Sequence, residues 1–308
     1  MSRISIVIPT LNRAEVLART LDRLERQAAA PESFEVVVVS DPAEREPEAL
    51  ERALGGRPFE LRHRVRHAPG VSAARNDGWR DARAPLVLFM GDDILASPGL
   101  VAEHLAWHER HPVRDVGVLG PVGWARELRV TPFMRWLEAG VQFDFLSIAG
   151  EEAGWGRFYT SNASVKHALL EQVGGFDEAF EFAYEDLDLA KRMADQGFRL
   201  LFARDAAAEH LHAPTVEEYR RRVAAIAVAE SRFVSKHHDV EPYFKPLFGR
   251  AAGWPSSRGR WARLAGVVPR DLPWLGERVW TSADRHFTAE LAPAFERAWD
   301  EAQSTSVR

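Results

Sequence analysis

The first 90 residues alternate between short apolar runs and helical patterns, and this alternation limits the fold more than any other feature of the chain. Residues 4–8, 34–39 and 86–90 are rich in β-branched and other apolar residues. Such short, continuous runs predict strands buried on both faces. After the first run, Asn12 and Glu15 have capping-box spacing, which predicts a helix start. Strands alternating with helices predict a parallel, doubly wound α/β sheet with right-handed crossovers.

Acidic residues directly follow two of these predicted strands. Asp41 comes after residues 34–39, and Asp92-Asp93 comes after residues 86–90. Ligands of such sheets bind beyond the carboxyl ends of the strands. Carboxylates leaving a buried strand are costly unless a cation meets them, and oxygen ligands suit Mg²⁺ or Mn²⁺ that bridges substrate phosphates. A capped turn or an ion pair with arginine explains the same residues equally well.

Two weaker signals lie further along the chain. Asp186 opens a predicted helix over 186–196, where the positive end of the helix dipole stabilises a carboxylate. An ordinary N-cap is the alternative interpretation. His210 follows a predicted strand over 198–203, and His212 competes with it for any role as a ligand.

Composition excludes several classes of function. The 308 residues carry a net charge of -5, which argues against general nucleic-acid binding. There is no cysteine, so disulfides and thiolate nucleophiles are excluded. The chain opens on a short strand-like run rather than a signal peptide, and no apolar stretch approaches the ~18 residues of a membrane span. We expect a cytoplasmic protein, at most peripheral to a membrane.

Seven motifs follow one another in a single order. They are Ile-Val-Ile-Pro-Thr-Leu-Asn-Arg at 6–13, Val-Val-Val-Val-Ser-Asp at 36–41, Gly-Val-Ser-Ala-Ala-Arg-Asn-Asp-Gly at 70–78, Phe-Met-Gly-Asp-Asp at 89–93, Gly-Gly-Phe-Asp at 174–177, Tyr-Glu-Asp-Leu-Asp-Leu at 184–189, and His210. Together this series resembles glycosyltransferase family 2, and the resemblance covers residues 4–212. It implies a GT-A fold, in which a Rossmann-like, mostly parallel sheet is flanked by helices.

The resemblance also implies roles for individual residues. Asp186 matches the catalytic base, and Asp93 and His210 match the ligands of Mn²⁺ or Mg²⁺. The residues implied to bind the nucleotide sugar are Pro9, Thr10, Arg13, Asp41, Arg75 and Asp92. Within that set, Asp41 would contact the base, Arg75 the diphosphate and Asp92 the ribose or sugar.

The sequence departs from the family pattern at three positions. Gly91 stands where the Asp-x-Asp motif has its first acid, Ser40 replaces an acid before Asp41, and Arg204 replaces a proline ahead of the histidine. The first departure leaves the metal motif to its last two members.

The implied function is metal-dependent transfer of one sugar per event from a nucleotide diphosphate sugar to an acceptor hydroxyl, with inversion. We expect a UDP- or dTDP-type donor and a saccharide or lipid-linked acceptor. The alternatives are a non-catalytic nucleotide-sugar-binding protein on a decayed GT-A fold, and a sugar-nucleotide pyrophosphorylase. The pyrophosphorylase would need a glycine-rich loop where the chain has Pro9-Thr10-Leu11-Asn12.

We expect a catalytic domain over 1–215, with a nucleotide-binding half over 1–95 and an acceptor half over 96–215, and a helical extension over 216–308. Within the extension, residues 242–270 contain no acid but six basic side chains, and Phe244, Phe248, Trp254 and Trp261 are interleaved with them. Packing within the protein or in a homodimer is favoured for this segment, and peripheral membrane contact is the alternative.

Overall fold

The computed structural model describes residues 2–251, 254 and 260–306. The chain divides into two compact units. Unit 1 comprises Met1–Glu127, Phe145–Glu181 and Glu185–His212, and unit 2 comprises Leu128–Asp144, Phe182–Tyr184 and Ala213–Arg308. The expected domain boundary between residues 215 and 216 stays a prediction.

In the part of unit 1 that the structure describes, a seven-stranded sheet has the order β3-β2-β1-β4-β8-β6-β9. Its strands are β1 (Ile4–Thr10), β2 (Phe34–Ser40), β3 (Glu60–Val65), β4 (Leu86–Met90), β6 (Val116–Leu119), β8 (Asn162–Lys166) and β9 (Arg199–Phe202). The three apolar runs are therefore β1, β2 and β4, as predicted. Strands β3, β2, β1 and β4 pair in parallel, so their carboxyl ends meet at one edge.

The sheet changes direction at β8, which pairs antiparallel with both β4 and β6. Beyond it, β6 and β9 pair in parallel, so the sheet is mostly parallel, as expected. A second sheet has the order β5-β10-β7, with β5 (Ile94–Ala96), β7 (Val122–Trp124) and β10 (Ala208–His210). Because β5 follows β4 and pairs with β10, this sheet places His210 near the carboxyl end of β4.

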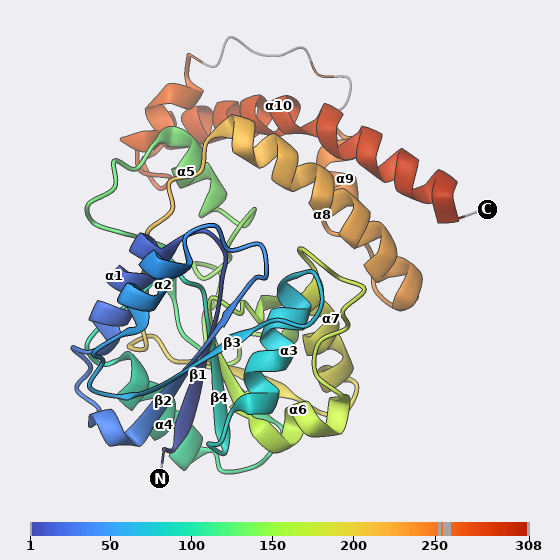
Figure 1. Ribbon diagram of the computed structural model, residues 1–308. Helices are drawn as coiled ribbons and strands as arrows, with labels where there is room; N and C mark the ends of the chain where they lie inside the picture. The colour runs from blue at the N-terminus through green and yellow to red at the C-terminus, as the bar shows by residue number, and fades with distance from the viewer. Residues whose placement is uncertain (1, 252–253, 255–259, 307–308) are drawn as a thin grey trace. The chain divides into compact units, whose positions relative to one another are not determined.

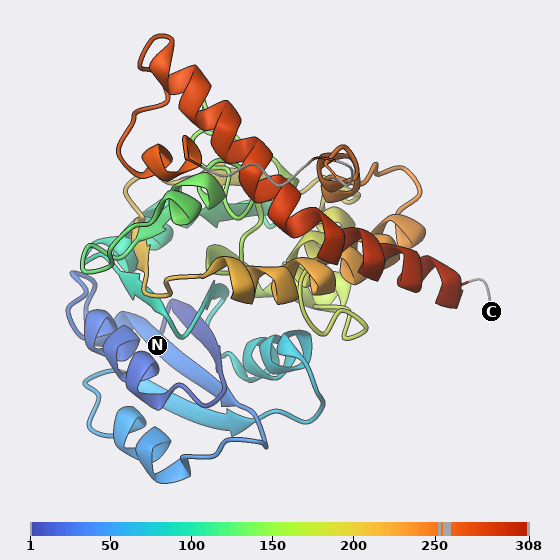
Figure 2. The same cartoon turned by 90° about the horizontal axis from the view of Figure 1, so that it is seen from above.

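Helices flank the large sheet of unit 1. They are α1 (Ala14–Leu24), α2 (Pro47–Leu54), α3 (Val71–Asp81), α4 (Leu100–Arg110), α6 (His167–Val173) and α7 (Glu185–Ala194). In Figures 1 and 2, α1 and α2 lie on one side of β1 to β4 and α3 lies on the other. A side chain at Gly78 of α3 would place its Cβ 2.3 Å from Val7 Cγ1, so glycine lets α3 pack closely on β1.

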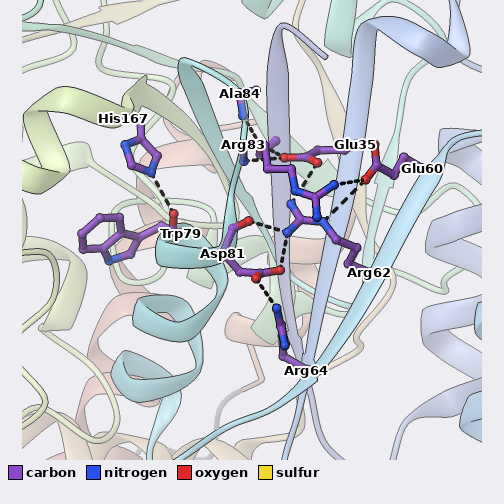
Figure 3. A network of polar contacts seen from close by, with 10 residues as sticks. Glu35, Glu60, Arg62, Arg64, Trp79, Asp81, Arg83, Ala84 and His167 are labelled. Atoms are coloured by element: carbon purple, nitrogen blue, oxygen red, sulfur yellow. Dashed lines mark hydrogen bonds and ion pairs between the residues drawn. The ribbon is translucent and has the colours of Figure 1, made fainter. Parts of the chain in front are cut away.

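Strand β3 forms one edge of the sheet and was not predicted, because its residues are polar and largely exposed. An ionic network holds it (Figure 3). The Arg62 guanidinium lies 2.9 Å from Glu35 Oε2 of β2 and 2.5 Å from Asp81 Oδ2 at the end of α3. Glu35 is buried and also accepts hydrogen bonds from Ser5 Oγ and from the Arg83 amide.

Strand β9 forms the opposite edge. A loop at residues 151–153, which lies ahead of β8 in the chain, covers part of it. The Ala153 amide donates to the Leu200 carbonyl at 2.8 Å, and the Phe202 amide donates to the Glu151 carbonyl at 2.7 Å. The Arg199 and Glu152 side chains form an ion pair beside these bonds.

The described part of unit 2 is helical. Its α-helices are α5 (Pro132–Leu137), α8 (Val216–Lys236), α9 (Phe244–Gly249) and α10 (Leu275–Ser306), and α10 packs against α8 (Figure 2). Of the four aromatic residues expected to pack, Phe248 is fully buried, with its ring centroid 5.0 Å from that of Phe295. By contrast, Trp254 and Trp261 are 41% and 40% exposed. Arg258, also part of that segment, lies outside the described residues.

Among the residues that the structure describes, no helix is long and apolar enough to cross a bilayer.

Candidate functional site

At the carboxyl ends of β1 and β4, the predicted site residues Thr10 and Arg13 both contact Asp92. Thr10 ends β1 and donates from Oγ1 to Asp92 Oδ2 at 2.8 Å, and Arg13 Nη1 lies 2.8 Å from Asp92 Oδ1. Arg13 Nη2 lies 2.9 Å from Asp93 Oδ2, so one guanidinium joins both carboxylates. Pro9, next to Thr10, is partly buried.

The turn after β1 differs from the predicted capping box. Helix α1 begins at Ala14, and its N-cap position makes no side-chain hydrogen bond. Instead, Asn12 Oδ1 accepts from the Arg45 amide at 2.8 Å, and the Asn12 amide donates to Glu44 Oε2 at 2.7 Å. Asn12 therefore joins the loops that follow β1 and β2.

The two neighbouring aspartates have different electrostatics. Burial raises the pKa of Asp92 to about 6, with Arg13 opposing the shift and the Asp93 charge adding to it. Burial also disfavours the charge on Asp93, but hydrogen bonding and attraction from His210 and Arg13 outweigh it and hold the pKa well below its usual range. Asp93 is therefore ionised at neutral pH, as a metal ligand must be.

Strand pairing places His210 beside Asp93. In the antiparallel pairing of β10 with β5, His210 is opposite Ile94, the residue after Asp93. His210 Nε2 lies 3.1 Å from Asp93 Oδ2. On the other side, Trp124 of β7 stacks on the His210 ring, with centroids 5.6 Å apart and planes at 18°.

The Asp93 and His210 side chains fit a shared divalent ion. Adjacent ligands of an octahedral Mg²⁺, with bonds of about 2.1 Å, lie about 3 Å apart, close to the observed 3.1 Å between Asp93 Oδ2 and His210 Nε2. Within the described ranges, no group of three or more His, Cys, Asp or Glu side chains could hold a metal. An ion held by Asp93 and His210 would have to take its other ligands from water and substrate phosphate, as Mg²⁺ often does.

Asp41 belongs to a separate cluster at the end of β2. Its Oδ1 accepts from the Ala43 amide at 2.8 Å, and its Oδ2 accepts from Arg66 Nε at 2.6 Å. Burial opposes the charge, but the bonds from Ala43 and Arg66 outweigh it and lower the pKa of Asp41. Next to it, Ser40 Oγ lies 2.8 Å from His63 Nε2. Arg66 was not predicted, although it lies in the basic stretch at residues 62–67.

Asp186 and Arg75 belong to a third cluster, which Glu185 links. Arg75 Nη1 of α3 lies 2.7 Å from Glu185 Oε1 in the first turn of α7. Arg75 Nε and Glu185 Oε2 are buried and have no hydrogen-bond partner among the described residues. Burial, reinforced by the neighbouring Glu185 charge and opposed by Arg75, raises the pKa of Asp186 to about 7. A carboxyl group with such a pKa suits proton transfer near neutral pH.

The motif at residues 70–78 sets the position of α3 and hence of Arg75. Gly70 has φ of 96°, and a Cβ there would come within 2.9 Å of Glu181 Cα. Asn76 is buried, and its Nδ2 donates to the Phe176 carbonyl at 2.9 Å while its Oδ1 accepts from the Trp79 indole at 2.8 Å. The backbone conformation thus explains the glycine at position 70, and internal hydrogen bonding explains the asparagine at position 76.

Comparison with known proteins finds related glycosyltransferases. The model of Glycosyl transferase family 2 matches residues 5–140, and that of Glycosyl transferase family 21 matches residues 133–268. A validoxylamine A glucosyltransferase of Streptomyces hygroscopicus subsp. limoneus is 30% identical over 272 residues, 78% of this chain and 58% of the relative. These matches support glycosyltransferase family 2 for this chain. The chain spans less than two thirds of that relative's length.

Solved structures confirm the expected GT-A fold. The mannosyltransferase PcManGT from Pyrobaculum calidifontis, in complex with GDP-Man and Mn²⁺, matches with a TM-score of 0.63 at 20% identity, over 97% of this chain and 88% of the other. S. aureus TarS in complex with UDP matches with a TM-score of 0.53 at 16% identity, over 98% and 92%.

Proposed function

We propose that the chain transfers a sugar from a nucleotide diphosphate sugar to an acceptor hydroxyl, one sugar per event and with inversion. The observation that carries the proposal is the convergence of Arg13, Asp92, Asp93 and His210 at the carboxyl ends of the parallel strands, where sheets of this kind bind nucleotides. The relative named for glucosylating validoxylamine A supports transfer to a discrete acceptor.

Asp93 and His210 would hold Mn²⁺ or Mg²⁺. When bound, the ion would offset the charge that develops on the departing diphosphate. The Mn²⁺ and GDP-Man of the mannosyltransferase, and the UDP of TarS, support a metal and a nucleotide diphosphate donor. We keep a UDP- or dTDP-type donor as the proposal, with Pro9 and Thr10 lining the nucleotide pocket and the cluster of Asp41 and Arg66 facing the base.

The protein's own side chains would carry out the remaining steps of the reaction. Asp186 would accept the proton of the acceptor hydroxyl while its oxygen forms the new bond to the anomeric carbon. The bond from that carbon to the phosphate oxygen breaks, and the nucleoside diphosphate leaves with the electron pair. Arg75 would face the diphosphate, and an interaction of this kind contributes roughly 3–4 kcal/mol to lowering the barrier. A single base with in-line attack inverts the anomeric centre.

Two alternatives are less well supported. A decayed, non-catalytic protein was suggested by Gly91 in the metal motif, but a Cβ at that position would lie 2.9 Å from Asp93 Oδ1. Glycine therefore leaves room for the Asp93 carboxylate that the site uses. A pyrophosphorylase is disfavoured because a tight turn bound to Arg45 and Glu44, with no glycine, follows β1.

The test is turnover of a panel of nucleotide diphosphate sugars with Mn²⁺, with and without saccharide acceptors, followed by analysis of the anomeric configuration of the product. Donor-specific turnover that yields the inverted anomer supports the proposal. Nucleotide-sugar binding without any turnover would favour the non-catalytic alternative, and release of pyrophosphate would favour the pyrophosphorylase.

The acceptor is proposed to be a saccharide or a lipid-linked saccharide. In unit 2, large apolar side chains stay exposed along the segment before α10: Trp261, Leu264, Val267, Leu272 and Trp274. Such exposure suits a partner surface, either a second copy or a membrane carrying the acceptor. Cosedimentation with anionic vesicles at low salt, together with sedimentation velocity of the protein alone, separates these two partners.

A further inference from the structure

The chain enters α7, and so reaches Asp186, through residues 182–184, two of which depart from ordinary backbone geometry. Ala183 has φ of 61° and Tyr184 has φ of 64°. Residues with a Cβ rarely adopt this left-handed conformation, and two in succession persist only where the surroundings impose it. Strained backbone of this kind concentrates at functional sites.

The residues on either side of this segment are anchored in unit 1. The Glu181 carbonyl accepts from the Val71 amide at 3.0 Å, and Glu185 pairs with Arg75. Residues 182–184 themselves group with unit 2. The strained segment thus leaves one compact unit and returns to it at the first residue of α7.

Three side chains of α8 hold the segment within unit 2. The Tyr184 hydroxyl donates to Glu230 Oε1 at 2.5 Å, and the Tyr184 ring lies 5.1 Å from the Phe233 ring between centroids. The Arg222 guanidinium lies 5.3 Å from the centre of the Phe182 ring. Tyr184 is itself buried, so its position is fixed by packing as well as by the hydrogen bond.

Glu230 is a rigid acceptor for that bond. It is fully buried, and its Oε1 also accepts from the Tyr243 and Phe244 amides at 2.7 Å each, while its Oε2 accepts from the Lys245 amide at 2.9 Å. Burial raises the pKa of Glu230, and these four hydrogen bonds oppose the rise. A carboxylate held by three backbone amides has little freedom to follow a moving tyrosine, so it fixes the tyrosine instead.

We propose that Tyr184 and Glu230 are positioning residues for Asp186. The hydrogen bond between them holds the left-handed turn that starts α7, and this turn sets where the Asp186 carboxylate lies. The proposal rests on the proposed function, because it assigns Asp186 the role of base. Neither residue takes part in the chemistry.

The test is Tyr184→Phe, which keeps the ring on Phe233 and removes only the hydroxyl. Losing a hydrogen bond to a charged acceptor should speed amide hydrogen exchange at 182–187 by about 10- to 100-fold. Because small displacements of a catalytic group are costly, kcat should fall by about 10- to 100-fold, with the donor KM close to that of wild type.

Tyr219→Phe is the matched control, since it removes the hydroxyl of a second buried tyrosine, which lies on α8, and it should change neither exchange nor kcat. The double variant Tyr184→Phe/Glu230→Gln should have nearly the same kcat as Glu230→Gln alone, because the two residues act as one pair. Wild-type exchange at 182–187 in folded Tyr184→Phe overturns the proposal, and so does wild-type kcat in an active enzyme. If the wild-type protein turns over no donor, the proposed function fails, while the exchange measurement still decides whether the pair holds the turn.

Discussion

Replacing Asp186 by asparagine should separate catalysis from stability, because the carboxylate that we propose as the base also lowers the stability of the fold when it is ionised. The change keeps the shape of the side chain and removes its charge and its capacity to accept a proton. We expect kcat to fall by about 10²–10⁴, the usual contribution of a positioned general base. Affinity for the nucleoside diphosphate should stay close to that of wild type, because Arg13, Asp93 and His210 are unchanged.

The effect on stability follows from the raised pKa of Asp186. The folded protein binds this proton more tightly than the unfolded chain, since the pKa is about 7 in the fold against an ordinary 3.8. Wild type therefore loses stability as pH rises from about 4 to about 7, and the full cost is present at higher pH. At about 1.36 kcal/mol per pH unit, that cost is at most about 4 kcal/mol. Asparagine never ionises, so the variant avoids the cost.

Urea unfolding measures this difference, and donor turnover measures kcat. The Asp186→Asn variant should be more stable than wild type near pH 8 and equally stable near pH 4. Asp205→Asn makes the same change at an exposed side chain between β9 and β10, and should alter neither quantity. If Asp186→Asn keeps more than about a tenth of wild-type kcat, or gains no stability near pH 8, the carboxylate is only part of the helix start.

Other features of the structure predict further outcomes. Chelation should abolish turnover, and Asp93→Ala and His210→Ala should each weaken Mn²⁺-dependent nucleotide binding in calorimetry; turnover that survives EDTA would contradict the metal site. Gly91→Ala should weaken the same binding because its Cβ would displace the Asp93 carboxylate, whereas Gly123→Ala, where a Cβ meets nothing within 4 Å, should not. Glu35→Gln should lower the free energy of unfolding by about 2 kcal/mol and leave kcat unchanged, since Glu35 lies at the amino end of β2; equal urea midpoints would refute this.

Sequence reasoning was most successful where burial leaves a strong local pattern. The runs that became β1, β2 and β4 are almost entirely apolar because both faces of the sheet are covered, and this pattern is visible in the sequence alone. The helical extension predicted from residue 216 begins with α8 (Val216–Lys236), whose buried side chains repeat at helical spacing. The same logic failed for β3, whose exposed, charged side chains carry no strand pattern.

The pairing of site residues depends on contacts that are distant in sequence. That His210 rather than His212 reaches Asp93 follows from the register of β10 on β5, which no local pattern encodes. Arg66 meets Asp41 only because β3 lies beside β2. The N-cap predicted for Asn12 was wrong because its amide and side chain bond to the neighbouring loop instead.

The two edge strands of the large sheet affect the tendency of the protein to aggregate at high concentration. An edge strand offers unpaired backbone groups to which another chain can add, which is a route to aggregation. On β3, the charged side chains of Arg62 and Arg64 would have to lose their partner Asp81 or be desolvated before a second strand could approach. On β9, the loop residue Ala153 already occupies part of the edge. Charged side chains therefore protect the β3 edge, and backbone hydrogen bonds to a loop protect the β9 edge. The folded protein should resist strand-to-strand association.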